Sequence, residues 1–253
     1  MITTASDDIG IQTHGHVAVV ELRRPPHNFF DITLITALAE TFEAIDRETD
    51  LRCIVLAAQG SSFCAGADFS RTADKPDDLY ACAVRLFATQ KPIVGAIQGP
   101  AVGGGLGLAL VPDFRIIAPE ARFAANFVKL GIHPGFALTS TLPRLIGMQK
   151  AALLLYTGRR ISAEEALNWG LADQLVPAAG LRDAAMSLAG EIAEAAPLAV
   201  TATRATLRAG LAEAFKAQTA HEAAEQTRLS LTQDFREGLK AVAERRPGRF
   251  VGA

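Results

Sequence analysis

The chain contains a glycine-rich segment, residues 99–107, whose backbone could bind an anionic oxygen. It follows a predicted strand and opens a predicted helix, and the N–H groups in the first turn of a helix have no partner inside that helix. Tight helix packing around small residues would explain the glycines equally well. Two phosphate-binding patterns are excluded, because Leu108 stands where a dinucleotide fingerprint has its third glycine and no Gly-Lys pair follows.

A second segment of small residues, 62–68, follows a predicted buried strand. Parallel sheets bind ligands at the carboxyl ends of their strands, and small residues let a ligand approach the backbone closely. Two such turns on neighbouring strands would aim two backbone N–H groups at one oxygen. That arrangement is an oxyanion hole, which stabilises the charge that develops when a thioester carbonyl becomes an enolate or a tetrahedral adduct.

The elements that must position these segments alternate between strand and helix in the first half of the chain. Leu34, Leu38, Phe42 and Ile45 form one helical stripe, and Asp31 is a residue type that caps helix N-termini. The expected strands are 17–22, 52–58, 93–97 and 114–118, and the expected helices are 32–47, 77–89 and 103–110. Short connections between them indicate an α/β fold with a mostly parallel sheet.

The second half of the chain changes character from about Ala137, where the pattern becomes helical and rich in Ala and Leu. We therefore expect an α/β core over residues 1–199 and a helical C-terminal extension over residues 200–253.

Several phrases of the sequence together resemble the crotonase (enoyl-CoA hydratase/isomerase) superfamily. They occur in the order typical of that family and cover nearly the whole chain. The phrases are Arg-Pro-Pro-His-Asn at 24–28, Phe-Cys-Ala-Gly-Ala-Asp at 63–68, Lys-Pro-Ile-Val-Gly-Ala-Ile-Gln-Gly at 91–99, Gly-Gly-Gly at 103–105, Gly-Arg-Arg-Ile-Ser-Ala-Glu-Glu-Ala at 158–166 and Gly-Leu-Ala-Asp at 170–173.

The resemblance implies an α/β spiral of ββα units with a helical C-terminal trimerisation region, in a homotrimer or a dimer of trimers. It implies acyl-CoA substrates and no separate cofactor, since coenzyme A arrives as part of the substrate. The oxyanion-hole donors would be the N–H groups of Ala67 and Gly104. Substrate contacts are expected at the turn residues Ala65 and Asp68 (Asp68 usually holding the turn), at Gly107, Asn126 and Phe127, and, for the coenzyme A phosphates, at Arg24, Arg71 or C-terminal arginines.

The sequence departs from the family at the two glutamates that a hydratase uses. Gly107 stands at the first position and Phe127 at the second, and residues 125–129 contain no carboxylate. Adding water across a double bond needs a base for the water and an acid for the α-carbon, and neither residue can transfer a proton. An aromatic ring at position 127 would also make the site drier and better suited to an apolar acyl chain.

His133 is the leading substitute for proton transfer, because histidine titrates near neutral pH and this one borders the family's active site. A histidine that merely bonds a loop carbonyl is the alternative. Asn126 could position a water or a thioester oxygen. Asp113 is expected to be a structural cap, and His27 is a weak candidate for chemistry.

Two functions remain open at this point. One is an acyl-CoA enzyme with altered chemistry, such as isomerisation, hydrolysis, decarboxylation or a restricted hydration. The other is a catalytically silent acyl-CoA-binding protein. A serine peptidase on the same spiral is not expected, because the chain has no Gly-x-Ser-x-Gly and no serine after the triple glycine.

Composition argues against nucleic-acid-binding, zinc-binding, secreted and membrane proteins. The formal net charge is −2, without the clustered excess of Lys and Arg that nucleic-acid binding needs. Three cysteines match no zinc spacing and are expected to be reduced thiols. The N-terminus has no secretory pattern, and no stretch approaches the ~20 apolar residues of a membrane span. We expect a cytoplasmic protein that acts on a small molecule, with neither nucleic acid nor membrane as a partner.

Overall fold

The computed structural model describes residues 6–68 and 76–253, and its larger sheet has six strands in the order β1-β2-β3-β4-β6-β9. β1 pairs antiparallel with β2, and every other neighbouring pair is parallel. The strands are β1 (Ile9–His14), β2 (Val17–Leu22), β3 (Cys53–Ala58), β4 (Ile93–Ile97), β6 (Phe114–Ile117) and β9 (Gln174–Leu175). The four strands expected from the sequence are thus confirmed within one residue.

A smaller sheet runs beside the first and makes the chain a spiral. It contains β5 (Ala101–Val102), β7 (Phe123–Ala124) and β8 (Arg160–Ile161), and isolated bridges between Phe30 and Ala67 and between Cys64 and Ala101 continue its pairing. Successive passages of the chain place a strand in the larger sheet, then a short stretch in the smaller one, then a helix. This is the expected spiral of ββα units.

The helices of the first half also match the prediction. They are α1 (Ile32–Arg47), α2 (Pro76–Phe87) and α3 (Gly104–Ala109). Asp31 caps α1, because its carboxylate accepts the N–H of Leu34 at 2.8 Å. The predicted apolar stripe of α1 is buried against the sheet.

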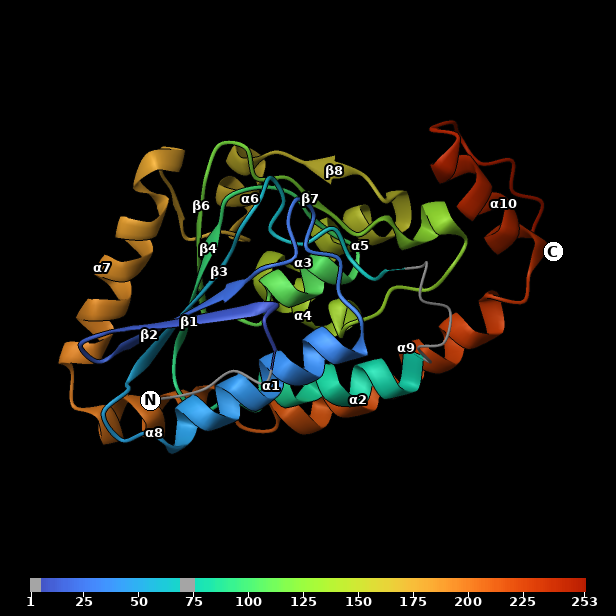
Figure 1. Cartoon of the computed structure of the whole chain (residues 1–253). Helices are drawn as coiled ribbons and strands as arrows, with labels where there is room; N and C mark the ends of the chain where they lie inside the picture. Colours follow the sequence, from blue (N-terminus) through green and yellow to red (C-terminus); the bar gives the residue numbers. More distant parts are fainter. Residues whose placement is uncertain (1–5, 69–75) are drawn as a thin grey trace.

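Helices make up most of the second half. They are the 3-10 turns η1 (Asn126–Leu130) and η2 (Ala178–Gly180), and α4 (Leu138–Ile146), α5 (Met148–Thr157), α6 (Ala163–Trp169), α7 (Leu181–Glu194), α8 (Pro197–Leu207), α9 (Leu211–Leu229) and α10 (Gln233–Ala243). The predicted division between residues 199 and 200 falls inside α8. In Figure 1, α9 runs along α2, and α10 lies at the far end of the molecule.

The larger sheet has a hydrophobic core on each face. On β3, Cys53, Val55 and Ala57 face α7, which lies alone on one side of the sheet in Figure 1. Ile54 and Leu56 face the main core with α1 and α2. Covering on both faces explains why this strand reads as a continuous apolar run rather than an alternating one.

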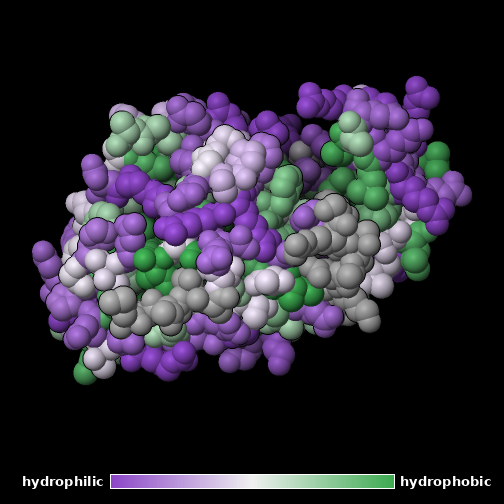
Figure 2. Space-filling view, viewed as in Figure 1, coloured by the Kyte–Doolittle hydropathy of each residue, from purple (hydrophilic) through white to green (hydrophobic). Residues whose placement is uncertain are grey.

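The surface mixes polar regions with apolar ones. In Figure 2 hydrophobic side chains gather around the end of the molecule that carries α10. Large apolar side chains that are exposed there include Leu231, Leu239, Val242, Phe250 and Val251. Among the described residues, no helix combines the length and the apolar character needed to cross a bilayer.

Candidate active site

The two small-residue segments meet in the fold as the sequence predicts. Cys64 pairs with Ala101, and the N–H of Val102 donates to the carbonyl of Cys64 at 3.0 Å. A Cβ atom placed on Gly66 would lie 3.0 Å from the carbonyl oxygen of Val102 and 3.8 Å from the nitrogen of Gly104. The end of the turn after β3 and the start of α3 are therefore neighbours.

Both predicted oxyanion donors belong to this junction. The Phe30 N–H donates to Gly66 at 3.0 Å and the Asp68 N–H donates to Phe30 at 2.9 Å, a pattern that leaves the N–H of Ala67 out of the ladder. Gly104 is the first residue of α3, where an N–H has no acceptor inside the helix. Within residues 6–68 and 76–253, neither N–H donates to a protein acceptor. That the two bind one substrate oxygen stays a prediction.

Close packing explains why this junction needs glycine. A Cβ atom on Gly105 would lie 2.1 Å from the carbonyl oxygen of Cys64, and one on Gly104 would lie 2.5 Å from Cζ of Phe30. Gly103 caps α3 with a φ of 58°, a conformation that favours glycine. Tight packing, one of the two explanations that the sequence leaves open for these glycines, is therefore observed, and a backbone site for an anion stays a prediction.

The space beside Gly107, where the resemblance places the first glutamate of a hydratase, is filled by another residue. A Cβ atom on Gly107 would lie 2.5 Å from Cβ of Phe136, whose side chain is fully buried. Phe136 and Ala137 have φ values of 60° and 57°, and each such non-glycine conformation costs of order 1–3 kcal/mol. Phe136 is a site residue that sequence reasoning missed. Its contact with Gly107 joins positions far apart in the chain, so no local pattern signals it.

Asn126 and Phe127 border the glycine turn, and contact of either side chain with a substrate stays a prediction. Relative to a Cβ atom placed on Gly103, Oδ1 of Asn126 lies at 3.3 Å and Cζ of Phe127 lies at 3.9 Å. Phe127 is buried and Asn126 is half-buried. Together with Phe30 and Phe136, Phe127 surrounds the start of α3 with aromatic rings.

His133 lies on a loop that faces the C-terminal helices. Its Nδ1 is 2.7 Å from the carbonyl oxygen of Pro134, and its ring centroid is 5.8 Å from that of His221 on α9. The first contact is the loop-carbonyl bond that the sequence left as the alternative. A role of His133 in proton transfer stays a prediction, and no described contact joins this ring to Ala67 or Gly104.

Arg24 and the residues around it support the turn formed by residues 62–68. The Arg24 guanidinium forms ion pairs with Asp8 at 2.8 Å and with Asp31 at 2.9 Å. The N–H of Ala65 donates to the carbonyl of His27 at 2.9 Å, which ties residues 24–28 to the turn. These contacts give Arg24 a structural role, and phosphate binding by Arg24 stays a prediction. Arg71 lies outside the described residues.

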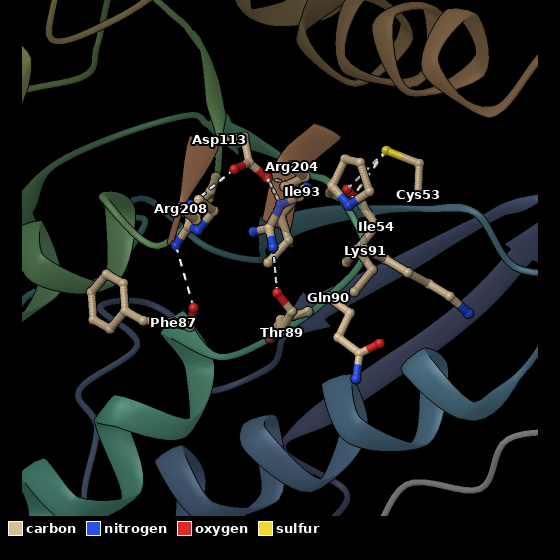
Figure 3. Close-up of polar contacts among 12 residues, drawn as sticks. Cys53, Ile54, Phe87, Thr89, Gln90, Lys91, Ile93, Asp113, Arg204 and Arg208 are labelled. Carbon is tan, nitrogen blue, oxygen red and sulfur yellow. Dashed lines mark hydrogen bonds and ion pairs between the residues drawn. The ribbon is translucent and has the colours of Figure 1, made fainter. Parts of the chain in front are cut away.

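Asp113 binds groups from three parts of the chain and has a structural role, in line with its expected role as a cap. Its carboxylate accepts the N–H of Ile93 at 2.9 Å, Nε of Arg204 at 2.8 Å and Nη1 of Arg208 at 2.8 Å (Figure 3). Arg204 also donates to the carbonyl of Thr89. These contacts hold the end of α8 against the core. A surface hollow of about 180 Å³ opens beside Asp113 and Arg208, and no residue of segments 62–68 or 99–107 lines it.

The described residues contain no group of three His, Cys, Asp or Glu side chains that could hold a metal ion. Cys53, Cys64 and Cys82 are free thiols. Burial raises the pKa of Cys53 and of Cys64 to about 12, so neither is a nucleophile at neutral pH.

Comparison with known proteins identifies the family of the chain. Residues 12–253 match the enoyl-CoA hydratase/isomerase family, and the chain belongs to that family. It is 36% identical to (E)-benzylidenesuccinyl-CoA hydratase of Thauera aromatica, over 97% of this chain and 99% of that protein. It is 35% identical to carnitinyl-CoA dehydratase of Proteus mirabilis, over 98% and 99% of the two chains. The crystal structure of an enoyl-CoA hydratase/isomerase from Pseudoalteromonas atlantica superposes with a TM-score of 0.90 at 27% identity, covering 97% of this chain and 100% of the other.

Proposed function

We propose that this protein is an enzyme acting on coenzyme A thioesters, in which the N–H groups of Ala67 and Gly104 bind the thioester carbonyl oxygen and stabilise an enolate. The observation that carries the proposal is the junction of the two turns, which leaves both donors without a protein acceptor among the described residues. Coenzyme A thioesters are named in both relatives, benzylidenesuccinyl-CoA hydratase and carnitinyl-CoA dehydratase.

The reaction would depend on polarising the thioester rather than on activating water. Two fixed N–H donors lower the energy of the enolate oxygen, and removing one such donor typically costs about 10²–10³ in kcat. Buried aromatic rings at Phe30, Phe127 and Phe136 keep water away and strengthen these hydrogen bonds. Neither Gly107 nor Phe127 can transfer a proton, so we do not expect ordinary hydration of crotonyl-CoA. Decarboxylation, in which loss of CO2 leaves the enolate and one proton is then added, and isomerisation, in which one shuttle removes a proton from one carbon and returns it to another, need fewer proton carriers than hydration and fit the site better. The carrier would have to be a group other than Gly107 or Phe127.

Deuterium incorporation tests this function directly. Acyl- and enoyl-CoA thioesters would be incubated with the protein in heavy water and analysed by mass spectrometry. We expect deuterium at the α-carbon above a control without protein. If no thioester gains deuterium, the enolate mechanism is wrong for this chain.

A pair of substitutions at one position isolates the backbone donor. Ala67→Pro removes the N–H of Ala67, which takes no part in the pairing with Phe30, while Ala67→Ser keeps it. We expect Ala67→Pro to slow the exchange about 10²-fold or more and Ala67→Ser to retain most of it. Equal rates in the two variants, with both folded, would remove Ala67 from the oxyanion hole.

A silent acyl-CoA-binding protein is the second candidate, and one observation favours it. Phe136 and Phe127 fill or border both positions where the family's hydratases carry carboxylates. Tight thioester binding in calorimetry, without exchange or conversion across a broad thioester panel, would support this role. Efficient conversion of any thioester would rule it out.

We also propose that the chain assembles as a homotrimer or a dimer of trimers. The apolar side chains that gather around α10 support a subunit contact, because contiguous apolar patches on a protein surface often mark protein–protein contacts. Among the exposed large hydrophobic residues that the structure describes, those with the largest exposed fractions are Leu198 at 84%, Tyr156 at 79%, Leu207 at 75%, Leu231 at 75%, Met148 at 70% and Val251 at 70%. Light scattering after size-exclusion chromatography measures the mass, and a monomer at micromolar concentration would contradict the proposal.

A further inference from the structure

A row of polar residues on α9 holds the loop that carries Phe136. Gln218, Glu222 and Gln226 are spaced four residues apart, so they share one face of the helix. Nε2 of Gln226 donates to the carbonyl of His133 at 2.8 Å, and Nε2 of Gln218 donates to Oγ1 of Thr139 at 2.8 Å. Between them, Glu222 binds the same loop. The C-terminal extension therefore fixes both ends of residues 133–139.

Glu222 is the ionisable residue of this row. It is fully buried, and its carboxylate accepts the N–H of Ala137 at 2.8 Å, the N–H of Thr139 at 3.1 Å and the hydroxyl of Thr139 at 2.5 Å. Among the described residues, no Arg, Lys or His pairs with it. Burial outweighs the three hydrogen bonds and raises the pKa of the Glu222 carboxyl to about 7. A buried carboxylate without a cation costs stability, which suggests a role other than stabilising the fold.

Glu222 is linked to the oxyanion donors through Phe136. The two N–H groups that it accepts belong to Ala137 and Thr139, just after Phe136, and the backbone is left-handed at both Phe136 and Ala137. Cδ2 of Phe136 lies 3.7 Å from a Cβ atom placed on Gly104, and the same ring packs on Gly107. The Phe136 ring also lies 5.6 Å, between centroids, from Phe30, which contacts Gly104 in turn.

We propose that Glu222 is a positioning residue for the oxyanion hole: its ionised carboxylate holds the start of α4 so that Phe136 packs against α3. The inference rests on the proposed function, and it makes the site depend on a group carried by the C-terminal extension. Protonation converts one acceptor oxygen into a hydroxyl donor, which cannot accept an N–H in the same direction. The three donors therefore favour the ionised form.

The ionisable groups around Glu222 come from three elements. Tyr80 of α2 faces it, and burial together with the charge of Glu222 raises the pKa of that phenol. His221 and Glu225 neighbour it on α9, and His133 lies on the loop that Gln226 holds. The test therefore needs variants that separate Glu222 from these neighbours. His221→Asn does so for His221, and Thr139→Val does so for His133, because Thr139 contacts Glu222 and the described contact of the His133 Nδ1 is with Pro134.

The first measurement is the pH profile of α-carbon deuterium exchange in the full-length protein, from about pH 5.5 to about pH 8.5. Wild-type kcat should fall about tenfold per pH unit below an inflection near neutrality, with KM moving less. Glu222→Gln should lower kcat and abolish the inflection. Glu225→Gln removes the same charge one turn away, where Glu225 pairs with Arg228 at 2.7 Å on the surface, and should keep the wild-type profile.

Two further variants keep the test decisive. Thr139→Val leaves the Glu222 carboxyl in place but deletes a donor to its ionised form, so the inflection should move to higher pH. His221→Asn should leave the inflection where it is. A Glu222→Gln protein with the wild-type inflection, or a Thr139→Val protein with an unmoved one, would overturn the proposal.

A structural readout separates failure of this inference from failure of the proposed function. Amide hydrogen exchange of residues 137–141, corrected for the intrinsic effect of pH, needs no turnover. We expect protection there to be lower in Glu222→Gln than in wild type, and unchanged in Glu225→Gln. If wild type transfers no deuterium to any thioester but shows this pattern, the proposed function fails while the link from Glu222 to α4 stands. Unchanged protection in Glu222→Gln would reject the link itself.

Discussion

Phe136 leaves no room for a side chain at position 107: a Cβ atom on Gly107 would lie 2.5 Å from Cβ and 2.7 Å from Cγ of Phe136. Phe136 adopts its left-handed conformation in this contact and is fully buried. The absence of a glutamate at position 107 is therefore part of how the core packs. Restoring a carboxylate there would require the Phe136 loop to move.

Substituting Gly107 should reveal this overlap as lost stability. We expect Gly107→Ala to lower the free energy of unfolding by about 1–3 kcal/mol, the usual cost of overpacking, although alanine favours helices. Urea unfolding measures the change. Gly190 in α7 is the matched control, because no atom lies within 4 Å of the position that an added methyl group would take, and Gly190→Ala should stabilise by about 0.5–1 kcal/mol. A similar effect at both glycines would show that Phe136 does not constrain position 107.

The Asp113 cluster should be essential to the docking of α8. Asp113→Asn leaves Arg204 and Arg208 without their shared counter-charge, and removing one partner of a buried pair costs about 3–5 kcal/mol. Burial, and after it the positive charge of Arg204, already lowers the pKa of Arg208. Glu237→Gln breaks the more exposed pair with Arg246 near the C-terminus and should have a smaller effect in the same urea experiment. Comparable losses would contradict this view of α8.

Stability should respond to pH through Glu222 with a definite sign. Its folded-state pKa is raised from 4.5 to about 7, so the folded chain holds a proton that the unfolded chain releases. The contribution of Glu222 to stability is complete below about pH 4.5 and is lost as pH rises through about 7, a change of about 3 kcal/mol at about 1.4 kcal/mol per pKa unit.

Glu222→Gln should therefore gain stability relative to wild type on going from about pH 5 to about pH 8. Thermal unfolding of both proteins at the two pH values measures this difference. A gain in stability combined with a loss of deuterium exchange would be typical of a residue kept for function. A constant difference between the proteins at the two pH values would mean that Glu222 has an ordinary pKa.

Local patterns in the sequence are sufficient to predict elements that bury one face, such as α1, or both faces, such as β3. The stripe of α1 with its Asp31 cap and the apolar run of β3 each carry their own pattern, and both were predicted within one residue. β1 was missed because Gln12, Thr13 and His14 lie on an edge strand and lack a clear alternation. β5, β7 and β8 have two residues each, too few for any periodicity, and exist only because the spiral brings them together.

The site was predictable only where a motif is contiguous in sequence. The turns at 62–68 and 99–107 are marked by their small residues, and the structure joins them. Phe136 gave no such signal, because a left-handed backbone is expected at glycine and not at phenylalanine. Glu222 lies 83–85 residues from the groups it binds, on a helix that otherwise reads as an ordinary surface helix. Long-range contacts of this kind need the tertiary structure.

Phe127 offers a way to return a proton carrier to the site. Its ring lies beside the Gly103 turn, with Cζ at 3.9 Å from the Cβ position of that glycine, so a carboxylate at 127 would border the oxyanion donors. We expect Phe127→Glu to raise α-carbon exchange by about 10²-fold over Phe127→Gln, which has the same shape but cannot carry the proton. Both variants lose the buried ring and should be destabilised to a similar extent, so the comparison cancels the packing cost. If exchange is equal in the two variants, position 127 does not face the α-carbon, and the proton must travel from another side of the thioester.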